Sequence, residues 1–124
     1  MLGSSDLVGF VATTDLARAK AFYGEVLGLD HVGESPVAQV FDAGGTTLRV
    51  TLVDRVVAVP YTVLGWTVVD IEATIRAAQA KGVAFERFAG MDQDALGVWT
   101  TPGGQRVAWF KDPDGNVLSL TQPR

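Results

Sequence analysis

The chain has 124 residues, a net charge of −4 at pH 7 and no cysteine. This length fits one domain whose core needs no disulfide or metal for stability. The lack of cysteine excludes thiol nucleophiles, disulfides and Cys-ligated zinc or iron–sulfur sites, and it makes the cytoplasm the simpler setting. The acidic balance argues against a nucleic-acid partner, because such a partner requires a basic surface.

Nothing in the sequence predicts contact with a membrane. The longest apolar run, 56–60, is far shorter than a membrane span. The N-terminus does not have a basic segment followed by an apolar one, as a secretory signal does. We therefore expect a soluble, unprocessed protein.

The first half of the chain predicts a β-α-β-β-β unit. Asp15 is suited to cap a helix, and Gly28 to end it in the left-handed conformation. Apolar and polar residues at helical spacing fill the interval between them. The first expected strand is 7–13. After the helix, a short strand and the strand 37–41 are expected on either side of a turn at Ser35-Pro36. The fourth strand, 46–53, follows a turn at Gly44-Gly45.

The second half repeats this order after a linker. Asp70 is the second expected helix cap and Gly82 the second stop, with strands expected at 62–69 and 83–88. The segment Asp112-Pro113-Asp114-Gly115 has the residues of a type I turn followed by a left-handed residue, so it predicts a C-terminal hairpin.

The two halves differ in length at one place. The expected caps Asp15 and Asp70 are 55 positions apart, whereas the hairpin turns at 42–45 and 112–115 are 70 apart. About fifteen extra residues must therefore lie within 87–105, which is the expected ligand-facing loop. Met91, Trp99 and Trp109 flank this loop and are candidates to close a pocket, with surface or dimer packing as the alternative.

These patterns predict an α+β fold of two tandem βαβββ modules. The expected arrangement is a cupped, largely antiparallel eight-stranded sheet with helices on the outer face. We expect a single domain, 1–124, with module 1 at 1–54, a linker at 55–61 and module 2 at 62–124. Neither module has enough core alone, so they must pair within the chain or across a dimer.

Three stretches resemble motifs of the vicinal oxygen chelate superfamily, which includes glyoxalase I, extradiol dioxygenases and bleomycin-resistance proteins. Residues 14–29 resemble its first helix, Val69-Asp70-Ile71 with Lys81-Gly82-Val83 its second helix, and 110–116 its last hairpin. The resemblance spans nearly the whole chain and implies the fold. It does not fix the function, because this fold contains metal enzymes and pure binders alike.

The resemblance also implies where a metal would be bound, with one His, Gln or Glu on each of four strands. Counted from the matched motifs, these positions are Val8, Arg49, Leu64 and Ser119, and a shift by one residue gives Gly9, Leu48, Gly65 and Leu118. Neither set is a plausible group of ligands, because aliphatic side chains have no lone pairs and a guanidinium repels a cation. We therefore expect no metal and no other cofactor.

The same positions define the expected ligand site. Arg49 is the strongest candidate for a ligand contact, because it can bind a carboxylate or phosphate of a ligand bidentately. An ion pair with an acidic residue of the protein is an alternative of equal weight. Phe10 and Trp66 share strand parity with Val8 and Leu64 and are expected to stack on a flat ligand, or else to pack in the core or an interface. The full expected set is Val8, Phe10, Arg49, Thr51, Leu64, Trp66, Ser119 and Thr121.

Other candidates have simpler explanations. His31 is the only histidine, so it supports neither a two-histidine metal site nor a Ser-His-Asp triad. Asp112, Asp114 and Asn116 have the odd spacing of a calcium loop, but the positions that require Gly and Glu are occupied by Val117 and Pro123. We assign no catalytic residue.

The leading functional hypothesis is a metal-free binding protein for a small, partly aromatic or anionic molecule, acting as a homodimer like the bleomycin-resistance branch. The alternative is a divergent glyoxalase-like lyase, isomerase or dioxygenase with an unusual active site, so enzymatic activity stays open. A third possibility is a regulatory module that binds a peptide.

Overall fold

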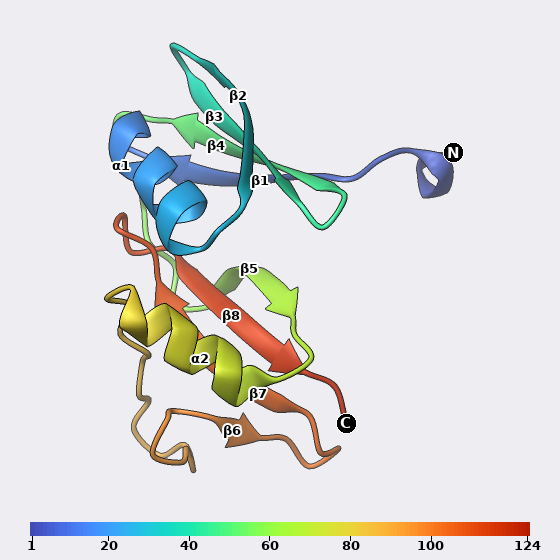
Figure 1. Cartoon of the computed structure of the whole chain (residues 1–124), viewed down its shortest axis with the longest axis vertical. Coiled ribbons are helices and arrows are strands. Elements are labelled where there is room, and N and C mark those ends of the chain that lie inside the picture. Colours follow the sequence, from blue (N-terminus) through green and yellow to red (C-terminus); the bar gives the residue numbers. More distant parts are fainter. The chain divides into compact units, whose positions relative to one another are not determined.

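The computed structural model describes all residues from 1 to 124, which divide into two compact units (Figure 1). Unit 1 comprises Met1–Val57 and unit 2 comprises Ala58–Arg124. The division between them falls inside the segment 55–61 that the sequence predicted as a linker. None of the helices is long and apolar enough to cross a membrane.

Unit 1 is a βαβββ module. A short 3-10 turn, η1 (Leu2–Ser4), precedes it. Its strands form one sheet in the order β1-β4-β3-β2, in which β1 and β4 are parallel and the other neighbours antiparallel. The elements are β1 (Val8–Thr13), α1 (Leu16–Lys20), η2 (Ala21–Val26), β2 (Asp30–Ser35), β3 (Ala38–Ala43) and β4 (Thr46–Leu52).

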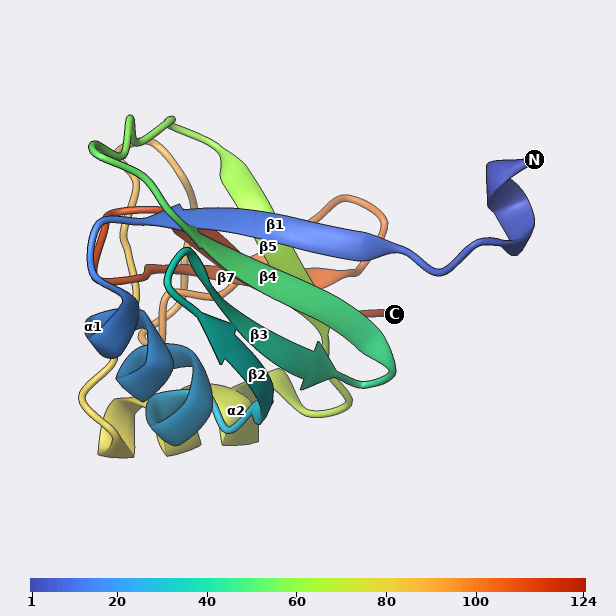
Figure 2. The same ribbon diagram turned by 90° about the horizontal axis from the view of Figure 1, so that it is seen from above.

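The first helix begins and ends where the sequence predicts. The Asp15 carboxylate accepts a hydrogen bond from the Arg18 amide at 3.0 Å, and Gly28 has a φ of 78°. Between them, α1 passes into the π-helical segment η2, a change that residue spacing alone did not indicate. Ala19 and Tyr23 are buried, and α1 lies against β3 and β4 on one face of the sheet (Figure 2).

Unit 2 has the same topology, with strand order β5-β8-β7-β6 and a parallel β5–β8 pair. The Asp70 carboxylate caps α2 by accepting from the Ala73 amide at 3.1 Å, and Ile71 and Ile75 are fully buried. Its elements are β5 (Thr62–Thr67), α2 (Ile71–Ala80), β6 (Trp99–Thr100), β7 (Arg106–Lys111) and β8 (Val117–Gln122). The expected α+β fold of tandem βαβββ modules is therefore confirmed, with the eight strands in two four-stranded sheets.

The C-terminal hairpin forms at the predicted turn between β7 and β8. The backbone oxygen of Asp112 accepts from the Gly115 amide at 3.0 Å. The buried carboxylate of Asp112 also accepts from the amides of Asp114 and Asn116 and from the Asn116 side chain, at 2.8–3.0 Å. These residues are therefore turn residues, as the failed match to a calcium loop indicated.

The strand expected at 83–88 is wrong. Only Phe85 pairs there, in an isolated bridge with Phe110. The fourth strand of the sheet is instead the two-residue β6, which pairs with β7 from within the predicted insertion. After Glu86, whose amide still donates to the Trp109 oxygen at 2.8 Å, the loop is held by the side chain of Gln93, which bonds to Glu86, Phe88 and Gly97.

Candidate functional site

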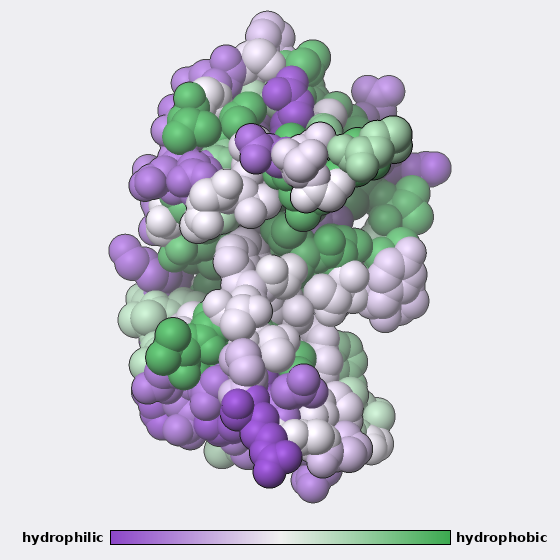
Figure 3. All heavy atoms as spheres, turned by 90° about the vertical axis from the view of Figure 1, so that its right-hand side faces the viewer, coloured by the Kyte–Doolittle hydropathy of each residue, from purple (hydrophilic) through white to green (hydrophobic).

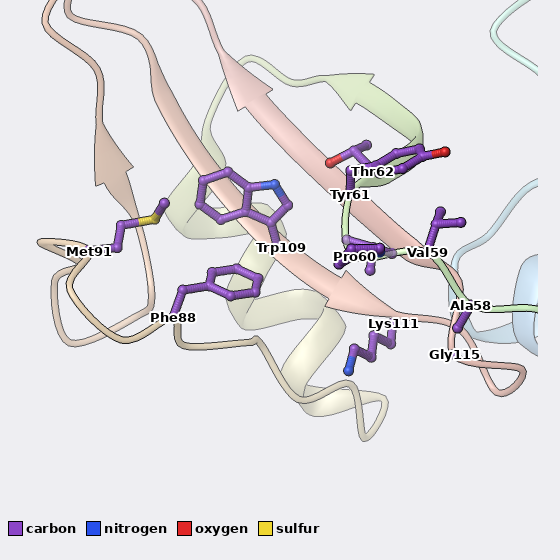
Figure 4. Close-up of a pocket in the computed structure, with 11 residues that line it drawn as sticks. Ala58, Val59, Pro60, Tyr61, Thr62, Phe88, Met91, Trp109, Lys111 and Gly115 are labelled. Carbon is purple, nitrogen blue, oxygen red and sulfur yellow. The ribbon is translucent and has the colours of Figure 1, made fainter.

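A pocket of about 540 Å³ lies within unit 2 (Figure 4). Its size is in the range of small-molecule sites. Its walls come from the segment before β5, the loop after α2, strand β7 and the hairpin turn. The lining residues are Ala58, Val59, Pro60, Tyr61, Thr62, Phe88, Met91, Trp109, Lys111, Gly115 and Val117.

Strand alternation explains why β7 contributes to both the core and the pocket. Phe110 is 2% exposed and pairs with the fully buried Leu118 on the face that packs against α2. Trp109 and Lys111 precede and follow Phe110, so their side chains lie on the opposite face, where both line the pocket. The face of the sheet away from α2 is therefore the floor of the pocket.

Trp109 is the centre of an aromatic cluster on this face. Its ring centroid is 5.4 Å from that of Phe88 in an edge-on arrangement and 6.3 Å from that of Trp99 in a stacked one. Met91 adds a polarisable thioether, and Figure 4 shows its side chain and that of Phe88 beside Trp109. Such a surface favours a flat, apolar ligand.

The side chain of Gln93 holds the loop that carries Phe88 and Met91. Its Oε1 accepts from the Phe88 amide at 2.8 Å, and its Nε2 donates to the backbone oxygens of Glu86 and Gly97 at 3.0 and 2.8 Å. Asp94 adds bonds from the amides of Leu96 and Val98 at 2.9 and 3.0 Å. The predicted insertion is therefore a hydrogen-bonded wall.

One charged group lines the pocket, the ammonium of Lys111. It forms an ion pair with Glu86 at 3.4 Å, in which the Lys111 side chain is 50% and the Glu86 side chain 31% exposed. The backbone fixes Glu86 there, because its amide donates to the Trp109 oxygen at 2.8 Å. The cation thus lies at the edge of an otherwise uncharged lining.

In unit 1, the predicted site residues lie on the face of the sheet away from α1. Leu48 and Val50 are buried on the helix side, which places Arg49 and Thr51 on the other. Phe10 is the register partner of Arg49 and is 64% exposed; Val8, on the same face, is 40% exposed. Figure 3, which shows the side of the molecule that faces right in Figure 1, has exposed hydrophobic residues (green) among hydrophilic ones (purple).

In unit 2, the expectation that Leu64 and Trp66 share a face with Ser119 and Thr121 is wrong. Trp66 stacks on Phe110 at 6.3 Å, and Leu64 pairs with Leu118, so both lie on the helix side. Leu64 lies six residues before Asp70, whereas Val8 lies seven before Asp15, and in a strand this difference of one residue exchanges the two faces.

The repeat spacing identifies the true counterparts. Trp66 lies 55 positions after Val11, which is buried on the helix side of unit 1, and Gly65 lies 55 after Phe10. Ser119 on β8 has two register partners, Gly65 on β5 and Trp109 on β7. Ser119 and Thr121 therefore do share the pocket face of the sheet.

The corrected positions fit a metal no better than the predicted ones. Val8, Arg49, Val63 and Ser119 present no imidazole or carboxylate. No group of three or more His, Cys, Asp or Glu side chains is placed to hold a metal ion. The lone His31 instead bonds its Nε2 to the buried Gln39 Oε1 at 2.6 Å, beside Phe41. The metal that the fold family implies therefore does not fit these residues.

Sequence reasoning missed part of the pocket. The sequence indicates only a linker and the start of a strand for 58–62, and it does not single out Phe88 or Lys111 as site residues, although all of these line the pocket. For Lys111 a signal existed, since it alternates with the core residue Phe110. No such signal marks Phe88, whose position depends on the bond from its amide to Gln93.

Two βαβββ modules of the same topology in one chain define a class of tandem-repeat α+β proteins. The family model described as "Glyoxalase/Bleomycin resistance protein/Dioxygenase superfamily" matches residues 7–120. The chain therefore belongs to this superfamily, as its motifs indicated.

Solved structures show the same fold. A superfamily member from Sphaerobacter thermophilus is 23% identical with a TM-score of 0.77, over 98% of this chain and 99% of that one. A lactoylglutathione lyase from Agrobacterium tumefaciens is 19% identical with a TM-score of 0.75, over 96% and 93%. The fosfomycin resistance protein FosX from Listeria monocytogenes is 15% identical with a TM-score of 0.74, over 98% and 94%. No curated protein sequence matches the chain.

Proposed function

We propose that the protein binds a small, partly aromatic molecule without a metal, and that the pocket of unit 2 is its ligand site. The observation that carries this proposal is the aromatic cluster around Trp109 in a pocket of about 540 Å³. A flat ring that enters it buries apolar surface against Phe88, Met91 and Trp109, at roughly 25 cal/mol per Å² before the costs of association.

The metal-free part of the proposal is supported by the donor set. A divalent cation needs oxygen, nitrogen or thiolate ligands, and the positions that the superfamily uses have Val8, Arg49, Val63 and Ser119 here. The competing function is a divergent lyase, isomerase or dioxygenase that uses other residues of the same sheets.

Further ligand contacts are proposed on the same faces of the two sheets. In unit 2 these are Ser119 and Thr121, which share the face of Trp109. In unit 1 they are Val8, Phe10, Arg49 and Thr51, of which Arg49 offers a planar cation for an anionic group. Leu64 and Trp66 are withdrawn from the proposed site because they lie on the helix side. We further propose that the protein is a cytoplasmic homodimer. Light scattering, which measures the molar mass in solution, tests whether it is a dimer.

The test uses the three tryptophans as site-specific reporters. In the ¹⁵N-labelled chain each indole N–H gives one resonance, which single Trp→Phe variants assign. Titration with 2-naphthamide, a neutral flat probe, is expected to shift the resonances of Trp109 and Trp99 and to leave that of Trp66 in place. Trp66→Phe is the matched control for Trp109→Phe, because it removes an indole from the opposite face of the sheet.

Two results would overturn the proposal. One is an equal response of all three indoles, or none, at probe concentrations up to the millimolar range. The other is tight, stoichiometric binding of Ni²⁺, Co²⁺, Fe²⁺ or Zn²⁺ in calorimetry. Turnover of a substrate that disappears in Arg49→Ala, with the fold intact, would favour the enzyme instead.

A further inference from the structure

Lys111 gives one wall of the pocket a positive charge that the other walls lack. It is the one charged side chain among the lining residues, and the remaining polar groups of side chains there are the hydroxyls of Tyr61 and Thr62 and the indole N–H of Trp109. No lining residue has a carboxylate, and the Glu86 carboxylate beside the pocket is paired with Lys111 at 3.4 Å. Lys111 is on the same strand as Trp109 (Figure 4), two positions further along and therefore on the same face of the sheet. A cation therefore borders the surface on which a ring would stack.

The ion pair with Glu86 leaves Lys111 able to bind a ligand. An ammonium has three donors, and Glu86 accepts from it at 3.4 Å through one carboxylate oxygen. Half-exposed pairs of this kind contribute little to stability, so a second anion can share the ammonium or displace Glu86. Because Glu86 is bonded through its backbone to β7, it also restricts where the ammonium lies.

We propose that this pocket selects planar aromatic ligands that carry an anionic group at one edge, with Lys111 as the residue that determines this specificity. The proposal rests on the proposed function and adds the substrate class to it. The ring lies on Phe88 and Trp109, and the carboxylate or other anion accepts a charge-assisted hydrogen bond from the Lys111 ammonium. Glu86 acts as an internal competitor for the same cation.

The test compares 2-naphthoate with 2-naphthamide, which have nearly the same shape and differ in charge. In calorimetry at low ionic strength the wild type is expected to bind the carboxylate roughly five- to tenfold more tightly than the amide. Lys111→Met is expected to abolish this preference, so that the variant binds 2-naphthoate no more tightly than 2-naphthamide. Glu86→Gln is expected to raise the affinity for 2-naphthoate by about two- to fivefold.

Lys20→Met is the matched control. It removes the same charge from a comparable pair in unit 1, where Lys20 is 3.5 Å from Glu34 and 48% exposed. It is expected to keep the full preference for the carboxylate. An equal loss in Lys20→Met and Lys111→Met would overturn the proposal, because net charge alone would then explain the selectivity.

The outcomes separate this inference from the proposed function. If the wild type binds both probes with equal affinity, or binds the amide more tightly, the anion selectivity is refuted and the aromatic site stands. If neither probe binds, both proposals fail. Circular dichroism of each variant excludes unfolding as the cause of a lost preference.

Discussion

The side chain of Gln93 is expected both to stabilise unit 2 and to hold the loop that contributes Phe88 and Met91 to the pocket. Gln93→Ala removes three hydrogen bonds, at 2.8, 3.0 and 2.8 Å, that join the loop after Phe85 to itself. Each such bond contributes about 1 kcal/mol, but the exposed Phe88 amide can bond to water instead. The free energy of unfolding should therefore fall by about 1–2 kcal/mol.

Binding should weaken as well, because Phe88 and Met91 then have to be ordered when the ligand enters. We expect the Kd for 2-naphthamide to rise by about three- to tenfold. Urea unfolding followed by circular dichroism measures the first effect, and calorimetry the second. Gln93→Glu keeps the acceptor for the Phe88 amide but places a carboxylate against the oxygens of Glu86 and Gly97, so it should destabilise at least as much as Gln93→Ala.

Gln79 offers the control for this experiment. It is exposed on α2, and Gln79→Ala replaces it with a better helix former, so stability and binding should hardly change. If Gln93→Ala behaved like Gln79→Ala in both assays, the loop would not depend on this side chain, and the account of the pocket wall would be refuted.

Three further predictions concern stability alone, measured by urea unfolding. Asp70→Ala removes the cap of α2 and should cost about 1 kcal/mol, whereas Asp70→Ser should recover most of it. Asp112→Ala leaves the buried turn amides without their acceptor and should cost about 2–3 kcal/mol, with Asp112→Asn less harmful because it keeps one oxygen. Gly65→Ala places a methyl group 2.6 Å from the Ser119 hydroxyl and should destabilise by about 1–3 kcal/mol. Adding Ser119→Ala should restore most of that loss; a double variant as unstable as Gly65→Ala would contradict the close contact.

The sequence predicted those features that depend on a few neighbouring residues. The caps Asp15 and Asp70 and the turn at Asp112 are local chemistry, in which a side-chain oxygen meets backbone amides two to four positions away. Such bonds form whatever surrounds them, so reading the residues suffices. The helix ends and the last hairpin followed from them, and so did the duplicated topology.

The direction of side chains on β5 depends on the exact number of residues between the strand and the cap Asp70. Counting six residues back from Asp70, instead of the seven that separate Val8 from Asp15, placed Leu64 and Trp66 one residue out of phase, and in a strand that error exchanges the two faces. The position of Phe88 could not be predicted in this way, because a hydrogen bond from its amide to the side chain of Gln93 fixes it. No composition or periodicity indicates such a bond.

Correct phasing also shows how the corresponding faces of the two modules differ in their side chains. The row Phe10–Arg49 of unit 1 corresponds to the row Gly65–Ser119 of unit 2, since the strand positions repeat at intervals of 55 and 70. Unit 1 thus has an exposed aromatic ring and a cation in this row, whereas unit 2 has only a glycine and a hydroxyl there. In unit 2 the aromatic and cationic groups are on β7, as Trp109 and Lys111. A ligand that needs both a ring surface and a cation finds them together on that strand.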